Sequence, residues 1–243
     1  MSGHSKWSTI KRDKEKTDAA RGKIFTKIGK EIVIAVKAGG GDPSTNPRLA
    51  TVIAKARANN MPNDNIQRSI KKATGELNSV NYEELVYEGY GPGGSAIMLN
   101  ILTDNKNRAA ADIRYIFERA GGSLGGPNSV SYLFTRKAVV VVKAKSGVSE
   151  DDVTMIALEA EADDVINEGE VFTIYAEPSK LNAIREQFEG AGMEIASAEV
   201  EMVPESNIEL DDTKYESFLK MLDRFEENDD VQNVFHNVEM REE

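Results

Sequence analysis

The spacing of the hydrophobic residues changes at Gly75, and this change constrains the fold more than any other feature of the sequence. Before Gly75, apolar residues recur every three or four positions, which is the period of an amphipathic helix. After it, short apolar runs of strand length come between helical segments. This order predicts an α+β protein with a helical N-terminal part and a remainder built on sheets.

The N-terminal part contains three predicted helices. The apolar positions of Ile24–Val36 fall on one side of a helix that the glycines at 39–41 end. A second helix follows Pro47 and stops before Pro62, and a third ends at Gly75. Three short helices with short connections predict a small helical domain. Residues 1–20 offer almost no apolar side chains to a core, so we expect a mobile arm there.

The remainder is predicted to contain two ferredoxin-like units. Between residues 138 and 203 the segments follow the order strand, helix, strand, strand, helix, strand, which defines one such unit. Outside it, predicted strands at 96–102 and 130–134 enclose one helix, and predicted strands at 207–210 and 231–238 enclose another. Together these two groups would form a second unit, with the first inserted at its middle connection.

The predicted fold class is therefore α+β, with an N-terminal three-helix domain followed by two ferredoxin-like α/β domains, one inserted into the other. The boundaries are 1–78 for the basic arm and helical domain, 79–135 plus 204–243 for a discontinuous middle domain, and 136–203 for the inserted domain. The simpler alternative is one continuous α+β domain over residues 80–243.

Charge is distributed unevenly along the chain. The formal net charge is −11, yet residues 1–77 hold 16 of the 30 Lys and Arg and only 7 of the 41 Asp and Glu. A basic segment joined to an acidic remainder indicates a module that binds a polyanion. A basic surface that is solvated and has no partner would give the same distribution.

Several kinds of chemistry find no support in the sequence. The lack of cysteine rules out thiolate metal sites and a cysteine nucleophile, and suits a reducing cytoplasm. His4 and His236 stand in unrelated contexts, so they form no metalloprotease or Ser-His-Asp pattern. Carboxylate pairs such as Asp229-Asp230 lie at helix starts or in loops. No apolar run approaches the roughly 20 residues that span a bilayer, and the N-terminus lacks the apolar stretch of a secretory signal.

We therefore predict a cytoplasmic protein that is not an enzyme and has no cofactor, no metal, no membrane partner and no small-molecule substrate. The glycine-rich segment 89–94, GYGPGG, does match the spacing of a dinucleotide-binding motif. That motif needs a helix after its glycines, so that the pyrophosphate meets the helix N-terminus, but a strand follows here. We interpret the segment as the turn of a hairpin, which Pro92 favours.

The cationic residues near the N-terminus are the candidate binding residues. Lys23, Lys27 and Lys30 fall about half a turn from the apolar side of the first helix. We expect them to face away from the core, so that replacing them by Gln removes phosphate attraction alone. With the arm they form a basic strip suited to sequence-independent phosphate contacts. The full predicted set is Lys6, Trp7, Lys11, Arg12, Lys14, Lys16, Arg21, Lys23, Lys27, Lys30, Lys37, Arg57, Arg68, Lys71, Lys72, Lys106 and Arg108.

Two parts of this set have alternative interpretations. Trp7, the only tryptophan, is predicted either to stack on a base or ribose or to staple the arm to the helical domain. The segment Asp104–Arg108 lies between a predicted strand and a predicted helix. We interpret it first as an Asx-type turn that caps the helix, and second as a polar hook for phosphate or ribosomal contacts.

Seven motifs between residues 2 and 237 resemble signatures of the YebC/PmpR family. They are SGHSKW, RGKIFTK, GGGDPSTNPRL, NNMPNDNI, YEGYGPGG, LTDNKNRAAADIR and DDVQNVFHN. The resemblance implies a helical domain and two α/β domains around a cleft, one α/β domain inserted in the other, and no enzymatic activity. The chain departs from the family pattern at Ser123, Asn128 and Glu161, the last at a position where glycine is more usual. These departures affect local turn geometry alone.

Members of that family are described as transcriptional regulators that bind DNA, and similar proteins, including mitochondrial translational activators, act on RNA and ribosomes. The sequence thus predicts a nucleic-acid-binding regulator of gene expression. We favour a translation factor that acts through ribosomal RNA, because a cationic arm without a recognition helix suits shape-led RNA surfaces better than base readout in a major groove. The alternatives are a DNA-binding transcriptional regulator and an acidic protein-interaction scaffold that uses residues 78–243.

Overall fold

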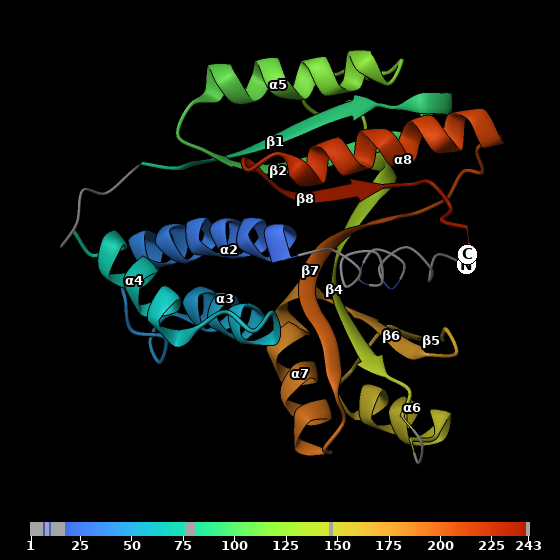
Figure 1. Ribbon diagram of the computed structural model, residues 1–243. Coiled ribbons are helices and arrows are strands. Elements are labelled where there is room, and N and C mark those ends of the chain that lie inside the picture. Colours follow the sequence, from blue (N-terminus) through green and yellow to red (C-terminus); the bar gives the residue numbers. More distant parts are fainter. Residues whose placement is uncertain (1–6, 8–9, 11–17, 76–80, 146–147, 242–243) are drawn as a thin grey trace. The chain divides into compact units, whose positions relative to one another are not determined.

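The computed structural model describes residues 7, 10, 18–75, 81–145 and 148–241. The chain forms two compact units (Figure 1). One contains Lys16–Leu133 and Ile208–Val238, and the other contains Met1–Glu15, Phe134–Asn207 and Glu239–Glu243. Within the first unit, helices precede a sheet, and the second unit holds a sheet of its own, so the predicted α+β class is confirmed. The exact three-domain boundaries stay a prediction.

The three predicted N-terminal helices are present as α2 (Asp18–Gly39), α3 (Pro47–Ala58) and α4 (Asn63–Ala73). Their apolar sides meet in one core, to which Ile32 and Leu49 contribute fully buried side chains. None of the described helices is long and apolar enough to cross a membrane.

Asn46 fixes the turn between α2 and α3. Its Oδ1 accepts the backbone N–H of Leu49 at 3.1 Å and so caps α3, while its Nδ2 donates to the carbonyls of Ala35 and Gly40 at 2.8 Å each. A Cβ at Gly39 would lie 2.8 Å from this side chain, and Gly40 has a φ of 86°. A side chain at position 39 would therefore collide with Asn46, and the left-handed backbone at position 40 favours glycine.

The sheet of the first unit has four antiparallel strands in the order β3-β1-β2-β8. The strands are β1 (Glu83–Tyr90), β2 (Ala96–Thr103), β3 (Ser123–Leu124) and β8 (Val231–His236). Two helices, α5 (Lys106–Arg119) and α8 (Asp212–Glu227), pack on it (Figure 1). The rings of Phe117 on α5 and Phe225 on α8 lie 5.1 Å apart. Gly89 and Tyr90 of the GYGPGG segment end β1, and the rest of the segment lies in the turn to β2, so the hairpin interpretation is confirmed.

Two predicted strands of this unit are wrong. Residues 131–133 form a 3-10 turn and not part of a strand at 130–134, because the Glu88 carboxylate accepts the backbone N–H groups of Asn128, Val130 and Ser131. The segment 207–210 makes a single bridge, between Ile208 and Val238, because the chain enters the cap of α8 directly after it.

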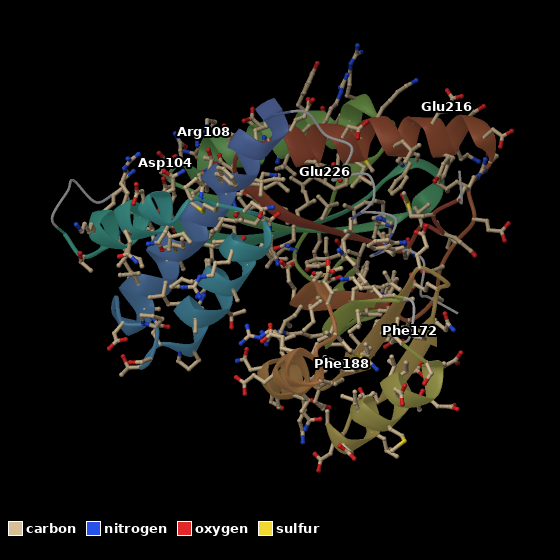
Figure 2. The ribbon with its side chains drawn as sticks, turned by 60° about the horizontal axis from the view of Figure 1, so that its bottom comes forward. Asp104, Arg108, Phe172, Phe188, Glu216 and Glu226 are labelled. Carbon is tan, nitrogen blue, oxygen red and sulfur yellow. The ribbon has the colours of Figure 1, made fainter. Side chains whose placement is uncertain are left out.

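The second unit is the predicted ferredoxin-like one. Its elements are β4 (Phe134–Lys143), α6 (Glu150–Glu159), β5 (Asp164–Asn167), β6 (Val171–Ala176), α7 (Leu181–Gly190) and β7 (Ile195–Pro204). The strand order β5-β6-β4-β7, antiparallel throughout, is the ferredoxin-like order. Helices α6 and α7 pack on one face of the sheet. The core between them includes Phe172 of β6 and Phe188 of α7 (Figure 2).

Two departures from the family pattern fall in the left-handed backbone region. Glu161 has a φ of 56° and Asn128 a φ of 64°. Asparagine tolerates this conformation, whereas a glutamate in it costs about 1 kcal/mol. The usual glycine at position 161 therefore has a conformational reason.

Candidate nucleic-acid interface

The lysines of α2 contact the C-terminal end of α8. The Nζ of Lys23 donates to the carbonyl of Glu227 at 3.2 Å, and the Nζ of Lys27 donates to the carbonyl of Glu226 at 2.7 Å. Carbonyls in the last turn of a helix have no partner within the helix and carry the negative end of its dipole. Figure 2 labels Glu226 on this helix. The lysines therefore donate to protein groups, so the expectation that replacing them by Gln removes phosphate attraction alone is wrong.

Lys30 joins a buried polar cluster around Asp230. Its Nζ donates to the Asp229 carbonyl at 2.8 Å and to Asp230 Oδ1 at 2.9 Å. The other oxygen, Oδ2, accepts from Arg108 at 2.8 Å and from the Thr103 hydroxyl at 3.0 Å. Burial opposes ionisation of Asp230, but these donors hold its pKa below the ordinary value. The cluster ties α2, the start of α5 and the α8–β8 connection together.

The segment Asp104–Arg108 forms the predicted turn and cap. Asn105 Oδ1 accepts the backbone N–H of Arg108 at 3.1 Å at the first turn of α5. The guanidinium of Arg108 binds Asp230 and also Asp104, at 2.8 Å, and Figure 2 shows Asp104 and Arg108 close together. The carboxylates, Asp230 first, raise the pKa of Arg108. A direct role of this segment in phosphate binding stays a prediction.

Two further candidate lysines also have protein partners. Lys37 Nζ donates to Asn81 Oδ1 at 2.7 Å, and the exposed Lys106 forms an ion pair with Glu83 at 2.5 Å. An exposed pair such as Lys106–Glu83 is readily exchanged for a phosphate, because it contributes little stability.

The predicted binding residues of α3 and α4 differ from those of α2. Arg57 on α3, together with Arg68 and Lys71 on α4, is exposed, and Lys72 is half-buried. Within the described part of the chain, no hydrogen bond or ion pair engages these four side chains. A cation whose charge is unpaired keeps its full attraction for phosphate. Among the described residues, this cluster, unlike the lysines of α2, is therefore a basic surface whose side chains have no protein partner.

A pocket of about 310 Å³ lies beside Arg57, between α3, α4 and the loop before α3. It is lined by Gly41, Pro43, Ala50, Ile53, Arg57, Asn63, Ile66, Gln67 and Ile70. The isoleucines give it an apolar floor, and the guanidinium and two amides are polar groups of its lining. The lining thus combines apolar side chains with a few polar groups, as small-ligand sites do.

Trp7 packs on the sheet of the second unit. Its Nε1–H donates to Glu170 Oε2 at 2.9 Å, and with Ile10 it covers the apolar cluster that contains Val139 and Tyr175. The interpretation of Trp7 as a staple to the helical domain is therefore wrong. The reason is that a sheet with both helices on one face needs cover on the other. The remaining arm candidates, Lys6, Lys11, Arg12, Lys14 and Lys16, and the side chain of Arg21 lie outside the described residues.

Sequence reasoning missed Asp230, which was grouped with loop carboxylates. The available signal was its place in the DDVQNVFHN motif, which resembles a family signature. Among the described residues, no three His, Asp or Glu side chains are grouped as a metal site. The groups described above are cations, helix ends and one buried carboxylate, Asp230.

The fold and the cationic helical part define a protein with an N-terminal helical domain and two sheet domains. The family model described as "TACO1/YebC protein N-terminal domain" matches residues 5–76, and the one described as "TACO1/YebC second and third domain" matches residues 82–238. The chain belongs to the TACO1/YebC family, which confirms the resemblance seen in its motifs.

Relatives match over their whole length. A protein of Thermoanaerobacter pseudethanolicus is 53% identical over 243 residues, covering 100% of this chain and 99% of the relative. One of Treponema denticola is 54% identical over 242 residues, covering 100% and 98%. Both are named "Probable transcriptional regulatory protein". The crystal structure of a conserved hypothetical protein from Aquifex aeolicus has a TM-score of 0.85 and 44% identity over 94% of each chain.

Proposed function

We propose that this protein is a non-enzymatic regulator of gene expression that binds nucleic acid through the exposed cations of α3 and α4. The observation that carries the proposal is the unpaired state of Arg57, Arg68 and Lys71 within the described residues, on adjacent helices of the basic segment. Three such cations can each neutralise a phosphate with little dependence on sequence. The name of the relatives supports a regulatory role.

RNA, and in particular ribosomal RNA, is the target that we favour. The pocket beside Arg57 offers an apolar floor and polar groups to an unstacked base, and single-stranded loops of RNA present such bases. Paired bases of duplex DNA remain stacked and cannot enter a pocket without being flipped out. Binding to promoter DNA is the second candidate, and the name of the relatives favours it.

The test compares the two targets at one salt concentration. Co-sedimentation with ribosomes and binding to promoter duplexes are measured for the wild type and for the variant Arg57→Gln, Arg68→Gln, Lys71→Gln. A control variant with the same loss of charge carries Lys180→Gln, Lys214→Gln and Lys220→Gln, which change exposed or partly exposed lysines of α8 and of the 3-10 turn before α7.

The first variant is expected to lose ribosome binding, and the control is expected to retain it. Promoter binding that exceeds ribosome binding in the wild type, and that the first variant loses, would assign the protein to DNA. Equal losses in both variants would mean that net charge, and not this surface, determines binding.

A further inference from the structure

One face of the sheet in the second unit carries no helix, and Trp7 and Ile10 of the N-terminal segment cover it. Helices α6 and α7 lie on one face of the sheet. On the other face, Val139, Val141 and Val171 have at most 1% of their surface exposed, and Trp7 and Ile10 pack against them. Without this cover, the three valines would present apolar surface to solvent.

The same face carries negative charge. The strand register places Glu199 opposite Val139, and Glu201 opposite Lys137, on this side of the sheet. Glu170 accepts the indole N–H of Trp7 at 2.9 Å from the turn before β6. Burial raises the pKa of Tyr175 on this face, and the charges of Glu168, Glu201 and Asp164 raise it further.

The N-terminal segment matches this face in both respects. Trp7 and Ile10 provide its apolar contacts, and Lys6, Lys11 and Arg12 are their direct neighbours or near neighbours in the sequence. A nucleic acid drawn to these cations while Trp7 and Ile10 are docked would approach the carboxylates of the face. At physiological salt the Debye length is about 8 Å, so carboxylates within about that distance of a phosphate repel it.

We propose that this face is a docking surface for Trp7 and Ile10 of the same chain, and that docking of these two side chains and binding of the N-terminal segment to nucleic acid exclude each other. The acidic sheet then acts as an internal competitor of the polyanion. The docking is independent of the proposed function, whereas the competition rests on it.

Release of the segment can be followed through Trp7, because it is the only tryptophan. Two full-length variants weaken docking: Ile10→Ser, which leaves the charge unchanged, and Glu170→Ala, which removes the acceptor of the indole N–H. Glu159→Ala on α6 is the control, since it removes the same charge from an exposed site on the helix-covered side. For each protein, Trp7 emission and its quenching by acrylamide are compared with the affinity for a labelled 24-nucleotide RNA.

Both docking variants are expected to shift Trp7 emission to longer wavelength and to increase its quenching. They should also bind the RNA about threefold more tightly than the wild type and Glu159→Ala, because an affinity rises with the fraction of competent protein. Unchanged Trp7 emission in both variants would overturn the docking. Shifted emission with unchanged or weaker RNA affinity would overturn the competition. If the wild type binds no RNA or DNA, the proposed function fails and the competition with it, while the emission shift still decides the docking.

Discussion

Two cationic surfaces of the N-terminal helices look alike in the sequence and differ in the structure. Lys23, Lys27 and Lys30 on α2 donate to groups at and just after the end of α8, and the Lys30 side chain is only 11% exposed. Arg57 and Arg68, on α3 and α4, are exposed and unpaired among the described residues. Helical spacing therefore predicts which side of a helix a charge lies on, but not whether another element of the fold contacts that charge.

The largest expected effect is the loss of stability when Asp230, the carboxylate that Lys30 and Arg108 share, is neutralised. Asp230→Asn leaves Lys30 and Arg108 without their shared carboxylate, and removing one partner of a buried pair costs about 3 kcal/mol. We expect the free energy of unfolding in urea to fall by about that amount. Asp229→Asn changes the adjacent, exposed carboxylate and should have almost no effect. Equal stability of the two variants would show that the cluster contributes little to the fold.

Replacing the exposed cations of α3 and α4 should weaken nucleic-acid binding and leave the stability unchanged. In the variant Arg57→Gln, Arg68→Gln, Lys71→Gln, the slope of log affinity against log salt for duplex DNA should flatten by about 2.7, because each lost phosphate contact contributes about 0.9. This slope corresponds to an increase of Kd of roughly a hundredfold at 0.15 M salt. Unfolding in urea should be unchanged, since the three side chains have no partners among the described residues. An unchanged slope would remove these residues from the interface.

The lysines of α2 give the direct counterpart. Replacing Lys23, Lys27 and Lys30 together by Gln should lower the free energy of unfolding by about 2 kcal/mol, because the charged donors to the end of α8 are lost. The salt slope should stay close to that of the wild type. If the variant is as stable as the wild type and its slope flattens by about 2.7, the lysines of α2 contact phosphate and do not stabilise the fold.

Much of the fold could be predicted because its signals are local. The apolar spacing of α2 and the strand pattern of β4 to β7 are properties of consecutive residues, and both elements formed as expected. The strand predicted at 130–134 failed because Glu88 takes the backbone donors from 40 or more residues away. No window of neighbouring residues contains that interaction.

The candidate site was less predictable for the same reason. The carbonyl that accepts from Lys27 lies 199 residues further along the chain, and the partner of Trp7 lies 163 residues away. Composition located the basic segment, and helical spacing located its cations. Only the tertiary structure separates the cations that contact other elements from those that have no partner among the described residues.

The smallest expected effect concerns Glu88, a buried carboxylate that pairs with no cation among the described residues. Glu88 is 7% exposed, and its carboxylate accepts three backbone N–H groups at 2.8 to 3.0 Å. Burial alone would raise the pKa of Glu88, but these donors hold it below the ordinary value. A lowered pKa means that the stabilisation is complete above the pKa of the unfolded chain, about 4.3, and is lost as the pH falls through the folded value.

Glu88→Gln should therefore lower the free energy of unfolding by about 1 kcal/mol at pH 7, because the bonds to a charged acceptor become bonds to a neutral one. The difference from the wild type should shrink as the pH falls below about 4, where Glu88 itself becomes protonated. Glu118→Gln, at an exposed site on α5, is the control and should match the wild type at each pH. A difference that persists undiminished at low pH would show that shape, and not charge, makes Glu88 suited to this turn. The negative charge of Glu88 would then contribute little to the free energy of unfolding, in contrast to that of Asp230, which is paired with cations.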